Sequence, residues 1–453
     1  MLNNTIVAQA TPIGSGAIAL IRLSGEDVFA IVSQIAKVHG PSLSERPSHS
    51  IAYGTVTSNE QACIDQVLFF LMHGPKTFTG EDCIEITCHN NQHIVQAIIH
   101  RCILAGARLA ERGEFTRRAV ENSKMELLQA EAIQDLIHAQ NAQEIQRALA
   151  QLDGSFSAWI NNLTQILIQA QALCEVSFEF LDEEYNPQKQ LIALLNSISQ
   201  QLALTEQQFS MQQQIRNGLR IVLIGSTNAG KSSLLNRICN QDRAIVTSVP
   251  GTTRDTIEVI IPKPNIAWTL VDTAGLRDTD DAIEAAGIKR TKREIAKADL
   301  LILLIDGTVQ RIPDDLQAEY RTIQQQHGHK LLIIQTKADL TTKENPFIQP
   351  DLYISNTQAT GFDELTKLIE AKSTQLLPST ELPFSLNQRH MHSITRVQKT
   401  LSTIITEAQK PTPLYEILSL HLSDSIAELN SISGKEQQEE LLNQVFSSFC
   451  VGK

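Results

Sequence analysis

Paired cysteines are missing from this sequence. Its seven cysteines are odd in number and scattered, and no two have the C-x-x-C spacing of a zinc site or a redox dithiol. They are Cys63, Cys83, Cys88, Cys102, Cys174, Cys239 and Cys450. We therefore expect reduced thiols in a reducing compartment rather than a disulfide framework.

Long apolar runs are missing as well. The longest strongly apolar stretch, LLILLI at 300–305, is far too short to cross a bilayer and is typical of a buried strand. The first residues, MLNNTIVAQATPIGSG, have no basic segment and are interrupted by Pro12 and by glycines before an apolar run develops. Both observations predict a cytoplasmic protein with no membrane span.

Positive charge is scarce, since 38 Lys and Arg face 50 Asp and Glu and give a formal net charge of −12. This balance excludes a surface that is basic overall, as general binding of nucleic acid requires. Any contact with RNA must be local or shared with a partner. The apolar fraction of 42% is ample for ordinary cores, and the length of 453 residues predicts about three domains.

The pattern of apolar and polar residues changes three times along the chain. Residues 1–120 carry strand-like pieces punctuated by Gly and Pro together with one helical pattern, which predicts an α+β domain. Residues 121–215 and 379–453 both have apolar residues at helical spacing on Gln-rich polar backgrounds. Because these two helical zones flank residues 216–378, we expect one discontinuous helical domain with an α/β domain inserted into it.

The strongest motif is LRIVLIGSTNAGKSS, in which an apolar strand leads into Gly225, four residues, Gly230, Lys231 and Ser232, and then a helix. Backbone N–H groups of such a loop surround the β-phosphate of a nucleotide, Lys231 reaches the β- and γ-phosphate oxygens, and Ser232 can ligate Mg²⁺. LVDTAG follows about forty residues later and supplies Asp272 for the Mg²⁺ shell. Together the two motifs predict a nucleotide switch.

The choice of base is predicted to lie in IIQTKADL and YISNT, each placed after an apolar strand. Asp339 can accept two hydrogen bonds from the N–H edge of guanine, which adenine lacks. The usual Asn of N-K-x-D is Thr336 here, and the usual Ala of the next loop is Asn356. We therefore expect guanine, held less tightly than usual.

The residue after D-T-A-G is Leu276, which cannot orient a water molecule as the glutamine of Ras-like switches does. Either the domain hydrolyses GTP poorly, or other groups position the water and supply transition-state charge. Asn228 offers a neutral oxygen suited to a monovalent cation, and the long switch I brings threonines near the γ-phosphate. Glu284 belongs to an acidic stretch that either orients water or forms a solvated helix start.

These segments, together with others at both ends of the chain, resemble the MnmE (TrmE) family of tRNA-modifying GTPases. The matching stretches are NTIVAQATP, GEFTRRA, LLQAEAIQDLI, GSTNAGKSS, GTTRD, DTAGLRD and SSFCVGK. The resemblance implies a multidomain α/β and α fold. Its parts are an amino-terminal α+β domain for folate binding and dimerisation, a discontinuous helical domain, and an inserted P-loop GTPase domain with a doubly wound sheet.

The resemblance also implies chemistry and partners. A homodimer would join the flavoprotein MnmG in a heterotetramer and add an aminomethyl or carboxymethylaminomethyl group at C5 of the wobble uridine of tRNA. The one-carbon unit would come from 5-formyl- or methylene-tetrahydrofolate. Hydrolysis of GTP with Mg²⁺ would be activated by K⁺, which stands in for an arginine finger.

Carried onto matching positions, the resemblance assigns roles to individual residues. Glu284, Cys450 and Lys231 would be catalytic, with Glu284 orienting water. The K⁺ ligands would be Asn228, Thr247, Val249 and Thr252, and the Mg²⁺ ligands Ser232 and Thr253. The nucleotide would be contacted by Asn228, Ala229, Gly230, Lys231, Ser232, Ser233, Thr247, Ser248, Val249, Pro250, Gly251, Thr252, Thr253, Asp272, Thr273, Ala274, Gly275, Thr336, Lys337, Ala338, Asp339, Ser355, Asn356 and Thr357. Folate would be contacted by Arg22, Glu85, Lys124 and Lys453.

Two features of this chain leave questions open. Cys450 either lies near the one-carbon chemistry, where nearby Lys or Arg would lower its pKa, or packs the last helix as a structural thiol. Where the family has GHGG, residues 88–92 read CHNNQ, so Asn90 and Asn91 alter the expected pterin pocket.

Two other functions stay open. The first is an RNA- or ribosome-binding GTPase switch without modification chemistry, although such proteins carry a basic RNA module after the GTPase domain. The second is a folate-dependent transferase whose GTPase domain has decayed. Lys231, Asp272 and Asp339 argue against decay, whereas Thr336 keeps it open. Folate binding would exclude the first, and potassium-stimulated GTP hydrolysis would exclude the second.

Overall fold

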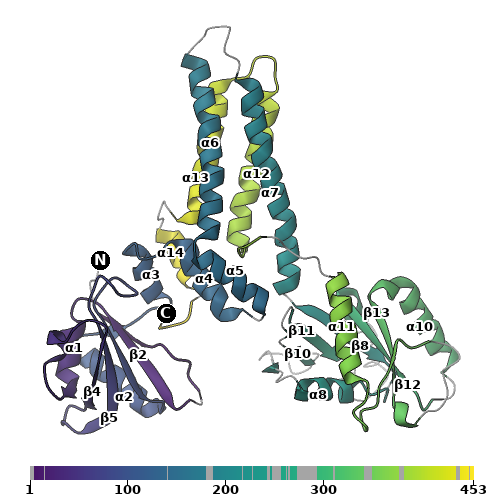
Figure 1. Ribbon diagram of the computed structural model, residues 1–453, viewed down its shortest axis with the longest axis horizontal. Coiled ribbons are helices and arrows are strands. Elements are labelled where there is room, and N and C mark those ends of the chain that lie inside the picture. The colour runs from purple at the N-terminus through teal and green to yellow at the C-terminus, as the bar shows by residue number, and fades with distance from the viewer. Residues whose placement is uncertain are drawn as a thin grey trace, which may run out of the picture. The chain divides into compact units, whose positions relative to one another are not determined.

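The structure, a computed structural model, divides into two compact units (Figure 1). It describes residues 5–14, 16–139, 141–179, 187–216, 218–226, 228–241, 245–246, 257–261, 263, 266–272, 293–309, 312–340, 349–376, 382–434, 439–447 and 449–452. The first unit joins residues 1–137, 149–198 and 396–453, and the second joins 138–148 and 199–395. Each unit is described by itself.

The amino-terminal part of the first unit is a seven-stranded sheet. Its strands, in spatial order, are β3 (Ala36–Val38), β4 (Ser50–Thr57), β5 (Cys63–Met72), β6 (Cys83–His89), β2 (Ile18–Ser24), β1 (Ile6–Gln9) and β7 (Arg108–Leu109). All neighbouring strands are antiparallel except β1 and β7. The helices α1 (Val28–Ile35) and α2 (Gln92–Leu104) share one apolar core with the strands, and a short η1 (Leu43–Glu45) adds to it.

Alternation along these strands sends one set of side chains into the core and the other outward. In β5, Val67, Phe69 and Leu71 are buried, whereas Leu68 is exposed between them. The sheet is therefore covered by helices on the buried side, and it carries apolar side chains on the other.

The remaining helices of the first unit come from segments far apart in the sequence. They are α3 (Glu114–Glu121), α4 (Leu127–His138), α6 (Ser155–Glu179), α13 (Tyr415–Ser433) and α14 (Glu439–Phe446). Helices α6 and α13 lie side by side (Figure 1). Their buried residues recur every three or four positions, as in Leu163 and Leu167 of α6 and Leu418 and Leu422 of α13. Helices α5 (Ala142–Leu152), α7 (Gln188–Arg216) and α12 (Gln388–Ala408) have residues in both units.

The second unit contains another seven-stranded sheet. Its order is β14 (Leu352–Tyr353), β13 (Leu331–Thr336), β12 (Leu300–Asp306), β8 (Leu219–Gly225), β11 (Trp268–Asp272), β10 (Ile257–Ile261) and β9 (Ile245–Val246). The first five strands are parallel, and β10 runs antiparallel to both of its neighbours, β11 and β9. Apolar clusters lie on both faces. The helices are α8 (Lys231–Gln241), α10 (Asp314–His327) and α11 (Phe362–Leu376), with short η2 (Gly328–Lys330) and η3 (Ala338–Leu340).

The expected fold class is confirmed. The LLILLI stretch is the fully buried strand β12, in the middle of the sheet. Parallel strands bring their carboxyl ends to one edge, so the residues that follow β8, β11, β12 and β13 gather there. The domain boundaries at 120, 215 and 378 stay predictions. Within the described residues no helix is both long and apolar enough to cross a membrane.

Candidate functional site

The phosphate-binding loop runs from the end of β8 to the start of α8. Gly225 has φ 144°, and a Cβ there would lie 2.4 Å from the carbonyl oxygen of Leu304, so the position requires glycine. Lys231, the first residue of α8, turns its side chain back over the loop. Its Nζ donates hydrogen bonds to the carbonyl oxygens of Gly225 (2.7 Å) and Ser226 (2.6 Å). The lysine is thereby fixed in the loop that it is predicted to serve.

Lys231 carries a buried positive charge. Its residue is 6% exposed, and burial lowers the pKa of the ammonium group, while the carboxylate of Asp272 acts in the opposite direction. The two hydrogen bonds to carbonyl oxygens satisfy the ammonium group but do not neutralise it. A phosphate bound at the loop would do so, because the start of α8 also favours negative charge.

The predicted Mg²⁺ residues Ser232 and Asp272 meet. The hydroxyl of Ser232 donates a hydrogen bond of 2.9 Å to Oδ2 of Asp272, whose residue is 2% exposed at the end of β11. Hydroxyl and carboxylate oxygens are ligands that suit Mg²⁺, which typically takes only one or two carboxylates beside phosphates and water. Among the residues that the structure describes, no group of three or more His, Cys, Asp and Glu side chains could hold a metal ion.

Three further predicted site residues lie in the same loop or on the first turn of α8. Asn228 is exposed and has φ 64°, a left-handed conformation that Asn adopts more readily than most residues. Ala229 is buried, and its N–H donates to the carbonyl oxygen of Ser226 at 3.2 Å. Ser233 is exposed on the first turn of α8. The amide oxygen of Asn228 is therefore available at the surface of the loop.

Thr336, which replaces the expected asparagine, fastens β13 to the phosphate-binding loop. Its residue is 2% exposed at the end of the strand. Its hydroxyl lies 2.9 Å from the carbonyl oxygen of Ala229 and 3.2 Å from that of Ile305 in β12. Three elements of the site are thus joined by one side chain.

Asp339, the predicted guanine contact, is held in place by the next loop. It lies in η3, and its Oδ1 accepts a hydrogen bond of 2.6 Å from the hydroxyl of Ser355. That hydroxyl in turn accepts from the backbone N–H of Gln358 at 3.1 Å. Ser355 is fully buried, and the N–H of Ala338 donates to the carbonyl oxygen of Ile354 at 3.1 Å. The carboxylate therefore has a fixed orientation.

Asn356 and Thr357 follow directly. Thr357 is exposed, whereas Oδ1 of Asn356 is buried and has no hydrogen-bond partner in the described part of the chain. An unsatisfied buried amide oxygen is uncommon and requires an explanation.

Two residues of this site, Asp306 and Tyr320, carried no sequence signal. Asp306 ends β12 and accepts a 2.5 Å hydrogen bond from the amino group of Lys337. Burial acts to raise the pKa of Asp306, but hydrogen bonds from Lys337 and Thr308 outweigh it and lower that pKa. Burial raises the pKa of Tyr320 in α10, which is hydrogen-bonded to Ser226. Neither residue follows a recognisable motif, so only the fold brings them to the loop.

Several predicted site residues lie outside the described residues. They are Thr247, Ser248, Val249, Pro250, Gly251, Thr252, Thr253, Thr273, Ala274, Gly275, Glu284 and Lys453. Their assignments, and that of Leu276, stay predictions.

In the amino-terminal domain the predicted folate residues Arg22 and Glu85 meet. They are paired positions on the neighbouring strands β2 and β6, and Nε of Arg22 donates to Oε1 of Glu85 at 2.7 Å. The guanidinium lies 5.6 Å from the ring centre of Phe78 and 5.7 Å from that of Phe115. The guanidinium of the charged pair thus lies beside two aromatic rings, of which Phe78 is exposed and Phe115 is buried.

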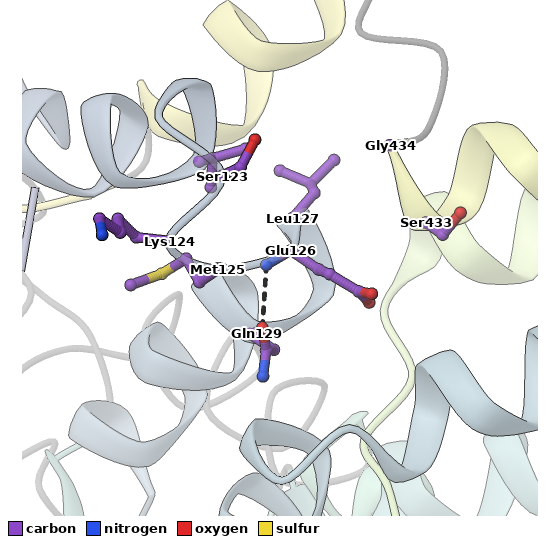
Figure 2. A pocket seen from close by; sticks show the side chains of 9 residues that line it. Ser123, Lys124, Met125, Glu126, Leu127, Gln129, Ser433 and Gly434 are labelled. Carbon is purple, nitrogen blue, oxygen red and sulfur yellow. Dashed lines mark hydrogen bonds between the residues drawn. The ribbon is translucent and has the colours of Figure 1, made fainter. Parts of the chain in front are cut away.

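Lys124 contacts the loop between β5 and β6. A Cβ at Gly80 would lie 2.8 Å from Cε of Lys124. A pocket of about 320 Å³ lies beside this lysine, and Figure 2 shows Glu126 extending toward Ser433 while Lys124 points the opposite way. The amino group of Lys124 is therefore directed away from this pocket, toward the amino-terminal sheet domain.

A second network near these residues carried no sequence signal. Glu81 accepts hydrogen bonds from Ser24 (2.7 Å) and from Arg118 (3.0 Å), and Arg118 also donates to Glu114 (2.9 Å). Glu114 is 8% exposed and pairs with Arg108 as well. Burial acts to raise the pKa of Glu114, but hydrogen bonds from Arg108, from the backbone N–H of Glu111 and from Arg118 outweigh it and lower that pKa.

The carboxyl-terminal tail lies against the same domain. The N–H of Gly113 donates to the carbonyl oxygen of Cys450 at 3.2 Å, and Val451 forms an antiparallel bridge with Arg112. A Cβ at Gly452 would lie 2.3 Å from the carbonyl oxygen of Gln9 on β1, and Gly452 has φ 93°. The thiol of Cys450 is exposed. It is therefore not a packing thiol of the last helix, whose contacts come from Phe446 and from the neighbouring Phe449.

Comparison with known families covers nearly the whole chain. A family model described as GTP-binding protein TrmE N-terminus matches residues 5–124, and one described as MnmE helical domain matches residues 127–450.

Comparison with individual proteins gives matches over the full length. Three relatives, each named tRNA modification GTPase MnmE, are 36% identical to this chain. That of Ligilactobacillus salivarius aligns over 468 residues, with 99% of this chain and 98% of the relative covered. That of Enterococcus faecalis aligns over 474 residues, with 99% and 98% covered. That of Parabacteroides distasonis aligns over 464 residues, with 99% and 100% covered.

Proposed function

The chain belongs to the MnmE family of tRNA modification GTPases, and from that premise we propose that it alters the wobble uridine of tRNA together with a flavoprotein. It is a GTPase that acts in tRNA modification. In the proposed reaction it works with MnmG to add an aminomethyl or carboxymethylaminomethyl group at C5. The carbon comes from 5-formyl- or methylene-tetrahydrofolate, and the chain acts as a cytoplasmic homodimer.

The GTPase part of the proposal rests on one observation: separate motifs meet at one edge of the parallel sheet. Lys231, Ser232 and Asp272 are linked around the phosphate-binding loop, and Thr336 joins that loop to the strand that precedes Asp339. Nucleotides bind at the carboxyl ends of parallel strands for the same geometric reason.

Each of these side chains has a distinct task. Lys231 binds β- and γ-phosphate oxygens, Ser232 and Asp272 hold Mg²⁺, and Asp339 accepts hydrogen bonds from the N–H edge of guanine. Asn228, with Thr247, Val249 and Thr252, holds K⁺. The two cations supply positive charge that offsets the charge of the phosphates in the transition state. Glu284 orients the attacking water, which Leu276 cannot do, and Thr253 completes the Mg²⁺ site.

The folate-binding part of the proposal rests on the side chains around Arg22 and Glu85. Reduced folate has a flat ring with hydrogen-bond donors and acceptors, and a tail of carboxylates. A carboxylate at Glu85 accepts from the ring, while Lys124 and Lys453 bind negative charge. The ring of Phe78, which is 38% exposed beside Arg22, supplies the apolar surface that such a heterocycle requires.

The position of the carboxyl-terminal tail supports a role for Cys450 in the folate chemistry. The tail contacts Gln9 on β1. Ala8, the residue before Gln9, is paired with Arg22 of β2. An exposed thiol held there is available for the one-carbon chemistry, as a thiolate nucleophile requires.

The homodimer is supported by the outer face of the amino-terminal sheet. Ile51, Tyr53 and Leu68 are 57%, 55% and 38% exposed on β4 and β5. They lie on the side of the sheet opposite the helices α1 and α2. A second copy of this face would remove the three side chains from water, so Tyr53→Glu is expected to give monomers in sedimentation analysis.

The test is mass spectrometry of nucleosides from tRNA incubated with the chain, MnmG, GTP, KCl, methylene-tetrahydrofolate and either ammonium or glycine, which supplies the nitrogen of the added group. We expect a modified wobble uridine with the wild-type chain, its loss in Lys231→Ala and in Glu85→Gln, and no change in the exposed control Lys37→Ala. Hydrolysis of GTP without modified uridine would favour the RNA-binding switch. Folate binding without hydrolysis would favour the decayed GTPase.

A further inference from the structure

Lys337 is one of the residues predicted to contact the nucleotide, and its side chain is held at the far end. Lys337 directly follows β13 and has φ 56°, a left-handed conformation that few residues other than glycine adopt. Its amino group donates a hydrogen bond of 2.5 Å to Oδ2 of Asp306, which ends β12. Because β12 and β13 are neighbouring parallel strands with Asp306 opposite Thr336, the lysine side chain reaches from the end of one strand to the end of the next.

Asp306 is held in place without the help of the lysine. Its Oδ1 accepts hydrogen bonds from the backbone N–H (2.9 Å) and the hydroxyl (2.7 Å) of Thr308, whereas Oδ2 serves Lys337. The N–H of Gly307 donates to the carbonyl oxygen of Thr336 at 3.1 Å, which ties this turn to β13. Burial acts to raise the pKa of Asp306, but the hydrogen bonds lower it, so the carboxylate is charged at neutral pH. The direction of the carboxylate is therefore set by its own turn, and the lysine adapts to it.

The side chain of Lys337 starts between the two parts of the nucleotide site. Thr336, the residue before it, is bonded to the carbonyl oxygen of Ala229 in the phosphate-binding loop. Asp339, two residues after it, has a carboxylate that Ser355 fixes. A nucleotide with its phosphates at the loop and its base at Asp339 therefore passes position 337. The side chain of Lys337 is 37% exposed, so it is accessible to such a ligand.

The ion pair changes what Lys337 offers to a ligand. A lysine side chain has many rotamers, and ordering it on binding costs free energy. Here the pair with Asp306, whose side chain is 9% exposed, orders the lysine before the ligand arrives. The pair also engages the ammonium charge, so the methylene groups of Lys337 are left to pack on the ligand. Lys231 differs, because its charge is bonded only to neutral carbonyl oxygens in the contacts given above.

We propose that Asp306 is a positioning residue for guanine nucleotides, which holds the side chain of Lys337 against the nucleoside part of the ligand. The inference rests on the guanine-nucleotide binding of the proposed function. Asp306 acts through the lysine and does not touch the nucleotide itself.

The test is isothermal titration of the full chain with GDP, together with displacement of GDP by pyrophosphate, which has two phosphates but neither base nor sugar. Asp306→Asn keeps an oxygen for Thr308 and removes the charge that holds Lys337. It should bind GDP about fivefold more weakly and pyrophosphate as before. The matched control Thr308→Val removes only the hydroxyl that bonds to the same carboxylate, and it should bind both ligands like the wild-type chain.

Lys337→Ala tests the same link from its other end. It should bind GDP at least about fivefold more weakly, and adding Asp306→Asn to it should cause no further loss, because Asp306 acts only through the lysine. A carboxylate that merely stabilised its own turn would instead reduce GDP binding by the same factor with and without the lysine.

Four results would overturn the inference. Asp306→Asn would bind GDP as the wild-type chain does, or it would weaken GDP and pyrophosphate equally, or it would cause the same loss in the Lys337→Ala chain, or Lys337→Ala would bind GDP normally. A wild-type chain that binds no GDP at all would contradict the guanine-nucleotide site itself, and this inference with it. The two failures are therefore distinguishable in one experiment.

Discussion

The amino-terminal domain and the nucleotide domain hold their charged and polar side chains in different ways. In the amino-terminal domain the positive charges of Arg108 and Arg118 are neutralised before any ligand binds, because both guanidinium groups pair with carboxylates of the same domain. In the nucleotide domain, Lys231 is bonded to neutral carbonyl oxygens, and Oδ1 of Asn356 has no described partner. The first arrangement stabilises the fold, whereas the second keeps binding capacity for a ligand at some cost in stability. The comparison shows that the same kinds of side chains stabilise the fold when the domain itself supplies their partners, and that they can bind a ligand when it does not.

The largest expected effect comes from a substitution in the nucleotide domain. Lys231→Met should reduce the rate of GTP hydrolysis roughly a thousandfold, because it removes the charge that binds the phosphate oxygens. Burial lowers the pKa of Lys231 in the folded chain, so at neutral pH its protonation favours the unfolded chain. We therefore expect the Tm to stay the same or to rise. A fall in the Tm, or unchanged hydrolysis, would contradict a functional role for this buried charge.

The next largest effect comes from a substitution in the amino-terminal domain, which is expected to lower stability rather than to leave it unchanged or raise it. Glu114→Gln should lower the free energy of unfolding by about 3 kcal/mol at pH 7, because it leaves Arg108 and Arg118 with a weakened partner in a largely buried network. The lowered pKa of Glu114 means that its contribution is present above the unfolded pKa and is lost as the pH falls through the folded pKa.

Urea unfolding at pH 7 and at a pH of about 3.5, below the ordinary pKa of a glutamate, checks this prediction. The difference between Glu114→Gln and the wild-type chain should shrink at the lower pH. A suitable control is Glu121→Gln, since Glu121 is 42% exposed in its pair with Arg117 and should matter little. Equal effects of the two substitutions at pH 7 would show that burial of the network is unimportant.

A smaller effect sharpens the account of base recognition. Ser355→Ala should weaken GDP binding about fivefold, because Asp339 loses the 2.6 Å hydrogen bond that orients its carboxylate. Binding of ADP, which gains nothing from Asp339, should change less. Competition binding with both nucleotides measures the ratio, and an unchanged preference for GDP would mean that Asp339 needs no support from Ser355.

The smallest effect concerns Arg22 and Glu85. Their side chains are 22% and 20% exposed, so a double-mutant cycle with Arg22→Gln and Glu85→Gln should give a coupling in stability below about 1 kcal/mol. Both single variants should nevertheless lose folate binding in equilibrium dialysis. A large coupling in stability with normal folate binding would place this pair among the structural ones.

The nucleotide site was predictable because its signals are contiguous. Residues 225–232 fall within one loop, and the apolar strand before them is recognisable by composition, as is β12. The link from Thr336 to Ala229 was not predictable, since it joins positions 107 apart, from the end of β13 to the loop after β8.

The amino-terminal site was predicted only through a family resemblance. Arg22 and Glu85 are 63 positions apart, and they meet because β2 and β6 pair in one particular register. A shift of one residue would send the two side chains to opposite faces of the sheet. Patterns of apolar residues predict that strands exist, but they do not determine which strands pair. Glu81, Glu114 and Tyr320 lie in a loop and in helices, and they were missed because only the fold brings them to their partners Arg118, Arg108 and Ser226.

The most direct test of the account is the steady-state rate of GTP hydrolysis in KCl and in NaCl at matched ionic strength, for the wild-type chain and for Asn228→Gly. Glycine removes the side-chain oxygen without straining a position that has φ 64°. The account predicts faster hydrolysis in KCl and loss of that difference in the variant. Equal rates of the wild-type chain in both salts would contradict cation-assisted hydrolysis at this loop.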